Sequence, residues 1–102
     1  MATLGAIVDD DPSNLDAVIA LSNIQRGEEL YKESAETLSK GLATIAAPTR
    51  VHWQLFYYRG IGYERTKQWP LAEADFKKAL DLNPDQPQVL NYLGYSWGDM
   101  GV

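Results

Sequence analysis

The chain has 102 residues, of which 45% are hydrophobic, and this size suits one small domain with a single core. Fourteen acidic residues against nine basic ones give a net charge of -5 at pH 7. This balance argues against a nucleic-acid binder and against docking on anionic lipid, because no cationic surplus is present. The sequence has no cysteine, which excludes disulfides and thiolate metal sites. No apolar run approaches the roughly 20 residues that a bilayer requires.

Proline and turn-forming residues divide the chain into segments. The breaks fall at residues 9–14, 26–29, 46–49, 65–70 and 83–87. No segment between them alternates apolar and polar residues with a period of two, so the predicted fold class is all-α. The segments predicted to be helical are 2–10, 14–26, 30–45, 49–66, 69–82 and 86–98. Helices of this length joined by short turns lie antiparallel to their neighbours.

Capping residues mark several of these helix starts. Ser13, Thr49 and Asp85 each precede a predicted helix and can accept a hydrogen bond from its free N–H groups. Pro70 suits the first turn of its helix, because the N–H that proline lacks would be unpaired there.

The chain is similar to itself at a fixed spacing, which indicates an internal repeat of two helices. One shift of the sequence along itself pairs Val18 with Phe56, Ser22 with Gly60, Tyr31 with Trp69, Ser34 with Ala72, Leu38 with Phe76 and Leu42 with Leu80. A slightly shorter shift pairs Gly60 with Gly94 and Tyr63 with Trp97. The two shifts differ by four residues, which fall around Pro48, in a loop, where insertions are tolerated best.

These residues resemble the tetratricopeptide repeat, a unit of about 34 residues with small and large residues at fixed positions. The matching residues of one unit are Phe56, Gly60, Tyr63, Ala72, Phe76, Ala79 and Pro84, and the next unit opens with Leu90, Leu93, Gly94 and Trp97. The preceding unit matches with Val18, Leu21, Ser22, Tyr31, Ser34, Leu38 and Gly41. Two positions depart from the family pattern, since Arg59 stands where the family has Leu and Gln25 where it has Tyr.

The resemblance implies a short right-handed α-solenoid of stacked helical pairs. Repeats are expected at 15–48 and 53–86, with half of a preceding repeat at 1–12 and the first helix of a following one at 87–102. The chain is therefore expected to be part of a longer, bacterial array whose bare ends self-associate.

Small residues are expected where the two helices of a repeat approach closely. Ser22, Gly60 and Gly94 hold this place on the first helices. Ala72 and Ala79 face them from a second helix, and Phe76 fills the wider space between.

The resemblance also implies a function. First helices of this family line a concave groove that binds an extended peptide or a helix of a partner protein. Carried over by position, the groove residues are Asp16, Ile19, Asn23, Arg26, Gln54, Tyr57, Tyr58, Ile61, Glu64, Gln88, Asn91, Tyr92 and Tyr95. Their amides can hydrogen-bond a peptide backbone, and their tyrosines supply rigid contact area. The alternative function is a structural solenoid that oligomerises through its exposed repeat ends.

One sub-class of the family clamps a C-terminal carboxylate with Lys, Asn and Arg on three successive first helices. The matching places here hold Ile19 and Asn23, then Tyr58, then Gln88 and Tyr92. Only Asn23 fits, so a cationic clamp of this kind is not expected.

No constellation of residues predicts an enzyme, a cofactor or a metal site. His52 is the only histidine and is expected to be structural, because no second imidazole or thiolate can join it. Lys77 and Lys78 beside Asp75 and Asp81 predict surface pairs at i,i+4 spacing. The aliphatic part of the Arg59 side chain is expected to pack against its neighbours, while the guanidinium reaches an acid or solvent.

Overall fold

The computed structural model describes residues 3–87, 89 and 91, and the described part is helical, with no strand. The helices are α1 (Leu4–Asp10), α2 (Leu15–Gly27), α3 (Tyr31–Leu42), α4 (Trp53–Arg65) and α5 (Trp69–Leu82). A short 3-10 helix, η1 (Arg50–His52), leads directly into α4. The all-α prediction is therefore confirmed.

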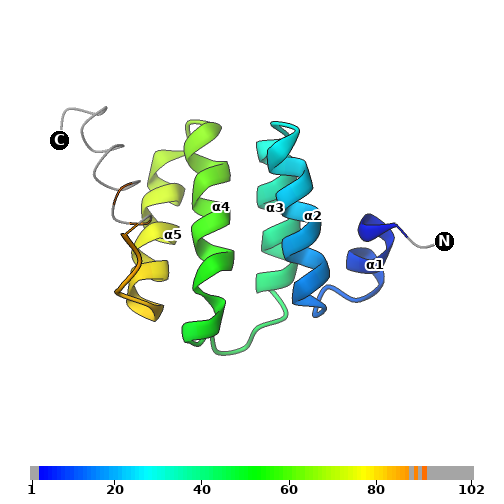
Figure 1. Cartoon of the computed structure of the whole chain (residues 1–102), viewed down its shortest axis with the longest axis horizontal. Coiled ribbons are helices and arrows are strands. Elements are labelled where there is room, and N and C mark those ends of the chain that lie inside the picture. The colour runs from blue at the N-terminus through cyan, green and yellow to red at the C-terminus, as the bar shows by residue number, and fades with distance from the viewer. Residues whose placement is uncertain (1–2, 88, 90, 92–102) are drawn as a thin grey trace.

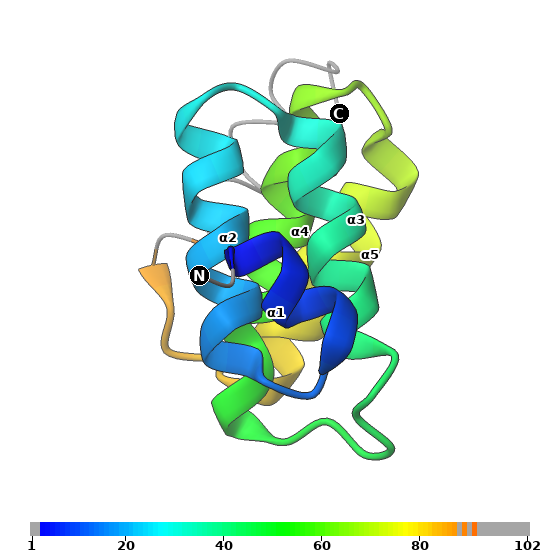
Figure 2. The ribbon, with the colours of Figure 1, turned by 90° about the vertical axis from the view of Figure 1, so that its right-hand side faces the viewer.

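The helices form two layers. Seen in Figures 1 and 2, α2 and α4 make one layer, and α3 and α5 make the other. Tight turns join α2 to α3 and α4 to α5 at one end of the molecule, whereas a longer loop joins α3 to α4 at the other end (Figure 1). The short helix α1 lies against the first pair on the side away from α4 (Figure 2). The fold is thus two antiparallel helical pairs stacked side by side.

Helix boundaries differ from the prediction at a few places. The helix predicted for 30–45 ends at Leu42, where the Thr44 hydroxyl donates to the carbonyl oxygen of Gly41 at 2.7 Å. The helix predicted for 49–66 is α-helical only from Trp53, because residues 50–52 form η1. The helix predicted for 86–98 lies largely outside the described residues.

One predicted cap is wrong by a single residue. Asn14, not Ser13, caps α2, and its side-chain oxygen accepts a hydrogen bond from the Ala17 N–H at 3.2 Å. Ser13 instead hydrogen-bonds the carboxylate of Asp11. The cap predicted at Thr49 is confirmed, although it serves η1.

The two tight turns have the same backbone structure. Glu29 has φ 63° and Lys67 has φ 62°, and the two residues occupy matching positions of the two units. The N–H of the residue that follows each of them donates to the carbonyl oxygen five residues earlier in the chain. These hydrogen bonds run from Leu30 to Gln25 and from Gln68 to Tyr63, both at 2.8 Å. This is the Schellman pattern, in which a left-handed residue ends a helix. The repeat seen in the sequence is therefore repeated in the backbone.

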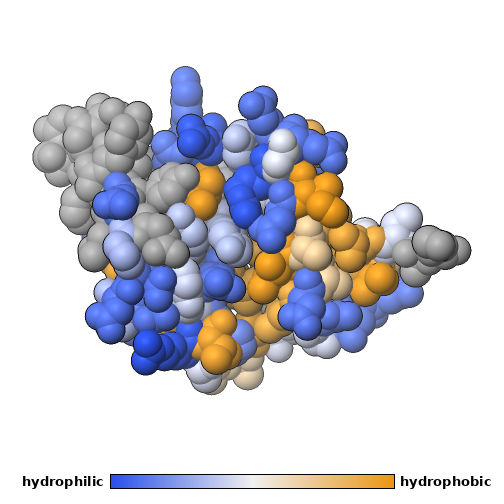
Figure 3. Space-filling view, viewed as in Figure 1, coloured by the Kyte–Doolittle hydropathy of each residue, from blue (hydrophilic) through white to orange (hydrophobic). Residues whose placement is uncertain are grey.

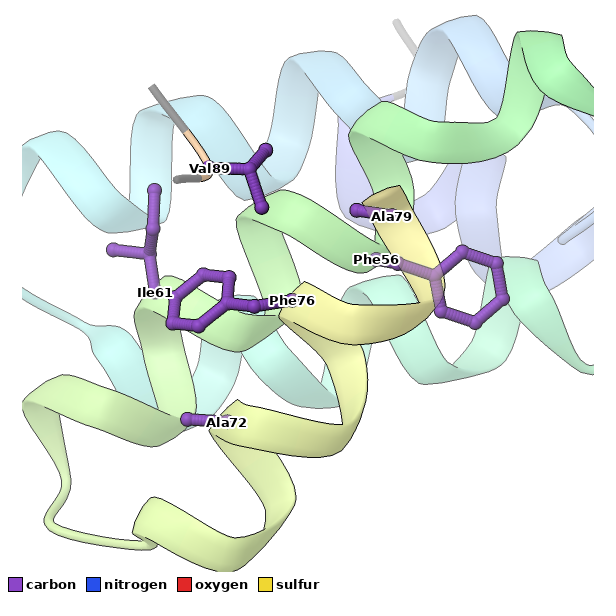
Figure 4. Close-up of a cluster of buried hydrophobic side chains, with 6 residues drawn as sticks. All are labelled: Phe56, Ile61, Ala72, Phe76, Ala79 and Val89. Carbon is purple, nitrogen blue, oxygen red and sulfur yellow. The ribbon is translucent and has the colours of Figure 1, made fainter. Parts of the chain in front are cut away.

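The core consists of two clusters of buried residues, and α4 contributes to both. The first contains Val8, Ala17, Val18, Leu38 and Leu55, and the second contains Phe56, Ile61, Ala72, Phe76, Ala79 and Val89. Figure 4 shows the second cluster, in which the ring of Phe76 extends from α5 beside Ile61 of α4. Leu42 and Tyr58 pack against both clusters. The two pairs therefore share a continuous apolar interior.

Close helix approach explains the small residues. A Cβ at Gly60 would lie 2.7 Å from Cε1 of Phe76, which is fully buried. Ser22 is also fully buried, and its carbonyl oxygen accepts a hydrogen bond from the Ser34 hydroxyl at 3.2 Å. These contacts confirm the expectation for Gly60 and Ser22, while Gly94 lies outside the described residues. Gly62 is a further small residue that was not predicted from the sequence, and a Cβ there would lie 3.0 Å from the Tyr31 carbonyl oxygen of the neighbouring pair.

Candidate functional site

The candidate site is the outer face of the layer that α2 and α4 form, which is the face seen in Figure 1. In the same view, Figure 3 shows hydrophobic side chains gathered over α2 and toward α1, whereas α4 is covered by more hydrophilic residues. Most of the predicted site residues in the described part of the chain lie on these two helices.

The structure gives these residues different degrees of exposure. Asp16 and Asn23 on α2 are exposed, as is Asn91. Half-buried residues make up most of the set, namely Ile19, Arg26, Gln54, Tyr57, Tyr58 and Glu64. Ile61 is only 6% exposed, because it packs in the core cluster with Phe76 and Val89, so its assignment to the binding surface is wrong. Gln88, Tyr92 and Tyr95 lie outside the described residues.

Aromatic rings form a row along α4. The ring centroids of Trp53 and Tyr57 are 5.8 Å apart, and those of Tyr57 and Tyr58 are 5.4 Å apart. Tyr57 also contacts Phe76 in the core, with centroids 6.3 Å apart. Because each ring packs on another, their orientations are fixed by the fold. The sequence analysis left out Trp53, although its spacing of four residues from Tyr57 places both on one helix face.

Arg26 continues this row onto α2. Its guanidinium carbon lies 4.3 Å from the centroid of the Tyr58 ring, so a cation–π contact joins the last turn of α2 to the middle of α4. Nη2 of Arg26 donates to the side-chain oxygen of Asn23, and Nη1 is buried without a hydrogen-bond partner. The guanidinium is therefore held in place by a ring and an amide.

Glu64 occupies the position on α4 that Arg26 occupies on α2 of the preceding unit. Its side chain is 20% exposed, and its Oε2 lies 3.5 Å from Nε of the neighbouring Arg65. Oε2 has no hydrogen-bond partner and is buried. The two matching positions thus carry half-buried charges of opposite sign.

Arg59 and Asp75 make an ion pair behind this face. Nε and Nη2 of Arg59 donate to the two carboxylate oxygens of Asp75, both at 2.8 Å, and Nη1 donates to the Ser39 hydroxyl at 3.2 Å. The guanidinium therefore joins α4 to α5 and also to α3 of the other pair. The expectation that the head of Arg59 reaches an acid is confirmed.

Burial raises the pKa of the Asp75 carboxyl above its ordinary value, and the hydrogen bonds and charge of Arg59 offset only part of this effect. For Arg59 burial acts to lower the pKa, but the hydrogen bonds and charge of Asp75 outweigh it, so the pKa is raised. The surface pairing predicted for Asp75 is therefore wrong. Lys77 instead pairs with Glu73 one turn before it, at 2.8 Å.

His52 has a structural position at the start of α4. Its Nδ1 accepts a hydrogen bond from the Thr49 N–H at 2.9 Å, while the Thr49 side chain accepts one from the His52 N–H. This reciprocal arrangement is a capping box. It agrees with the structural role expected for His52.

A hollow lies on the opposite side of the molecule, beside α3. It has a volume of about 470 Å³ and is lined by Lys32, Ala35, Glu36, Ser39, Lys40, Tyr63 and Gln68. Lys40 also pairs with Asp9 of α1 at 3.1 Å. The lining carries charges of both signs, and the sequence analysis did not single it out.

Two features are absent from the described residues. Residues 3–87, 89 and 91 contain no group of three or more His, Cys, Asp or Glu residues that could hold a metal ion. Within the same part of the chain, no helix has both the length and the apolar character needed to cross a bilayer.

Comparison with known proteins agrees with this architecture. No solved structure matches the chain. The family model for the tetratricopeptide repeat matches residues 53–86, the segment that contains α4, the turn after it and α5. The second helical pair, with the close approach of Gly60 to Phe76, is the matched repeat. Residues 53–86 are therefore a tetratricopeptide repeat.

Proposed function

We propose that the face of α2 and α4 binds an extended peptide or a helix of a partner protein, and that the chain acts as a non-catalytic scaffold. Tetratricopeptide repeats generally mediate protein–protein interactions, which supports a protein as the partner. The observation that carries the proposal is the row of Trp53, Tyr57, Tyr58 and Arg26, whose half-buried side chains are fixed in position before any partner arrives.

Fixed side chains favour binding because little conformational entropy is lost when a partner covers them. Tyrosine and arginine are also the residue types that most often dominate binding energy at protein interfaces. Asn23 and Gln54 stand beside the row on the same two helices and carry amides. Such groups can donate to and accept from a peptide backbone.

The proposal can be tested with a photo-crosslinking amino acid placed at single positions. The reactive group replaces exposed Asn23 on α2 in one variant and exposed Lys78 on α5 in a matched control. We expect a discrete crosslinked partner from position 23 and none from position 78, followed by loss of that product when Gln54→Arg is added. Equal crosslinking from both positions, or no effect of Gln54→Arg, would contradict binding at this face.

The alternative, a structural solenoid that oligomerises through its repeat ends, predicts a different result. A reactive group at position 23 would then give no partner, and light scattering would show a mass that rises with protein concentration. The residues that would form the second of these ends lie largely outside the described part of the chain. No observation of the structure favours this alternative over peptide binding.

A further inference from the structure

We propose that the partner of the α2 and α4 face is an extended segment with an acidic residue that pairs with Arg26 and a basic residue that pairs with Glu64. This inference rests on the proposed function and adds the charge pattern of the partner. It follows from two half-buried charged side chains, each of which has one buried atom without a hydrogen-bond partner among the described residues.

Arg26 has no counter-ion within the described residues. The ion pairs of that part of the chain involve Lys40, Arg59, Arg65 and Lys77, and none involves Arg26. Its Nη1 is buried without an acceptor. A buried polar group without a partner costs free energy, and the cost is larger for a charged group. A carboxylate that reached this guanidinium would remove that cost.

Glu64 lacks a hydrogen-bond donor for one of its carboxylate oxygens. Its Oε2 is buried without a hydrogen-bond donor, and its ion-pair neighbour Arg65 is too distant at 3.5 Å to give a good hydrogen bond. Among the described residues, three buried side-chain polar atoms lack a hydrogen-bond partner. Two of them are Arg26 Nη1 and Glu64 Oε2, and the third belongs to Asn83. Unsatisfied atoms of this kind require an explanation, and a missing binding partner supplies one.

The two residues do not satisfy each other, since no ion pair forms between them. The guanidinium carbon of Arg26 lies 4.3 Å from the centroid of the Tyr58 ring, so the ring helps to hold the guanidinium in place. A stacked guanidinium keeps the N–H groups along its edge, which match the two oxygens of a carboxylate. The fold therefore presents one cation and one anion at separate places on the same face.

The repeat sets the spacing between these places. Arg26 and Glu64 hold the same position on neighbouring helices, and the axes of packed helices are about 8 to 10 Å apart. An extended peptide rises about 3.3 Å per residue, so residues i and i+3 lie about 10 Å apart. We therefore expect the acidic and basic residues of the partner to be separated by two others. A helical partner would need a separation of about seven residues for the same distance.

The test uses a phage library of random dodecapeptides selected on the full-length chain. Wild-type protein is expected to enrich peptides with an acid and a base at i and i+3, in one preferred order. Arg26→Gln should lose the preference for the acid, and Glu64→Gln the preference for the base. The charge exchange Arg26→Glu with Glu64→Arg should reverse the order. Lys32→Gln, on exposed α3 surface, is the matched control and should leave the pattern unchanged.

Affinity measurements on one enriched peptide separate a direct contact from an indirect one. Replacing its acid by the matching amide should weaken binding to wild-type protein about tenfold, as measured by fluorescence anisotropy. The same replacement should weaken binding to Arg26→Gln less than about twofold, because the contact is already lost. Equal losses with both proteins would overturn the pairing with Arg26.

Three other outcomes would overturn the inference in different ways. Enriched peptides that show no charge pattern, but compete with one another for this face, would overturn the charge pairing and leave the proposed function standing. If no peptide were enriched by folded wild-type protein, both the charge pairing and the proposed function would fail. A coupling of Arg26→Gln with Glu64→Gln in urea unfolding would show that the two residues pair with each other in the free protein, which also contradicts the inference.

Discussion

The ion pair between Arg59 and Asp75 can be replaced by the residues that the first helical pair carries at the same positions. Leu21 and Thr37 are the residues that match Arg59 and Asp75 when the two units are aligned. We predict that Arg59→Leu combined with Asp75→Thr leaves the protein about as stable as the wild type, or more stable, although each single change destabilises it.

The size of each effect follows from burial. The Asp75 side chain is only 7% exposed, and Arg59→Leu removes both hydrogen bonds to its carboxylate and leaves that carboxylate without a counter-charge. Breaking a buried pair in this way costs about 3 to 5 kcal/mol. Asp75→Thr should lower the free energy of unfolding less, by about 1.5 to 3 kcal/mol. The reason is that the Arg59 side chain is 21% exposed and keeps its hydrogen bond to the Ser39 hydroxyl.

The double variant avoids both penalties. A leucine has no charge to desolvate, and the threonine hydroxyl can donate to a carbonyl oxygen of its own helix, as Thr37 does to Glu33 at 3.0 Å. Burial raises the pKa of Asp75 despite the hydrogen bonds and charge of Arg59, so desolvation offsets part of what the pair gains. Replacement of buried pairs by apolar residues is often neutral or stabilising by about 1 to 4 kcal/mol.

The pH dependence of the Arg59→Leu variant gives a second measurement. When the pKa of an acid is raised on folding, the protein loses stability as the pH rises. The loss begins near the pKa of the acid in the unfolded state, about 3.8, and continues through its pKa in the folded state. Removing Arg59 raises the pKa of Asp75 further and widens this window. The free energy of unfolding of Arg59→Leu should therefore fall as the pH rises above about 4, relative to the double variant, which lacks the carboxyl.

Urea unfolding followed by circular dichroism measures all four proteins of this cycle. Wild type and double variant should agree within about 1 kcal/mol, or the double variant should be the more stable. A double variant that loses the sum of the two single losses would refute the reasoning, because the pair would then contribute net stability. A flat pH profile for Arg59→Leu would refute the assignment of its loss to the buried carboxylate.

Four further changes test the fold by thermal or urea unfolding. Gly60→Ala should destabilise the protein by about 1 to 3 kcal/mol, because its Cβ would lie 2.7 Å from the Phe76 ring, whereas Gly27→Ala, with open space around it, should stabilise by up to about 1 kcal/mol. The opposite ranking would show that the Phe76 ring moves freely. Lys67→Gly should stabilise by about 0.5 to 1 kcal/mol, since its φ of 62° suits glycine, and no gain would argue against strain in that turn. Thr49→Ala should cost about 1 kcal/mol through loss of the capping box, and a neutral result would mean that the cap does not stabilise α4.

Packing inside a helical pair was predictable from the sequence for a physical reason. Ala72 and Phe76 are a small and a large residue one turn apart on α5, and Gly60 is the small residue of α4 that Phe76 packs on. All three belong to the same hairpin. The position of Ile61 was harder to predict. Helical periodicity shows which side of α4 the residue faces, but not that Phe76 and Val89 cover it there.

Electrostatic partners were less predictable because they depend on the folded hairpin. Asp75 stands beside Lys77 and Lys78 in the sequence, which suggested an exposed pair. Its actual partner, Arg59, lies sixteen residues away and meets it only when α4 packs on α5. The unsatisfied atoms of Arg26 and Glu64 are likewise properties of the packed structure.

Leu42 and Tyr58 pack against both core clusters, and Arg59 bonds to α5 of its own pair and to Ser39 of the other. Separating the two pairs would therefore expose apolar surface from both cores and remove a hydrogen bond from a largely desolvated guanidinium. Nearest-neighbour contacts of this kind provide the coupling energy between units in an α-solenoid. The described pairs should consequently lose their structure together, as a single cooperative unit, so that a destabilising change in either pair lowers the stability of the binding face that spans both.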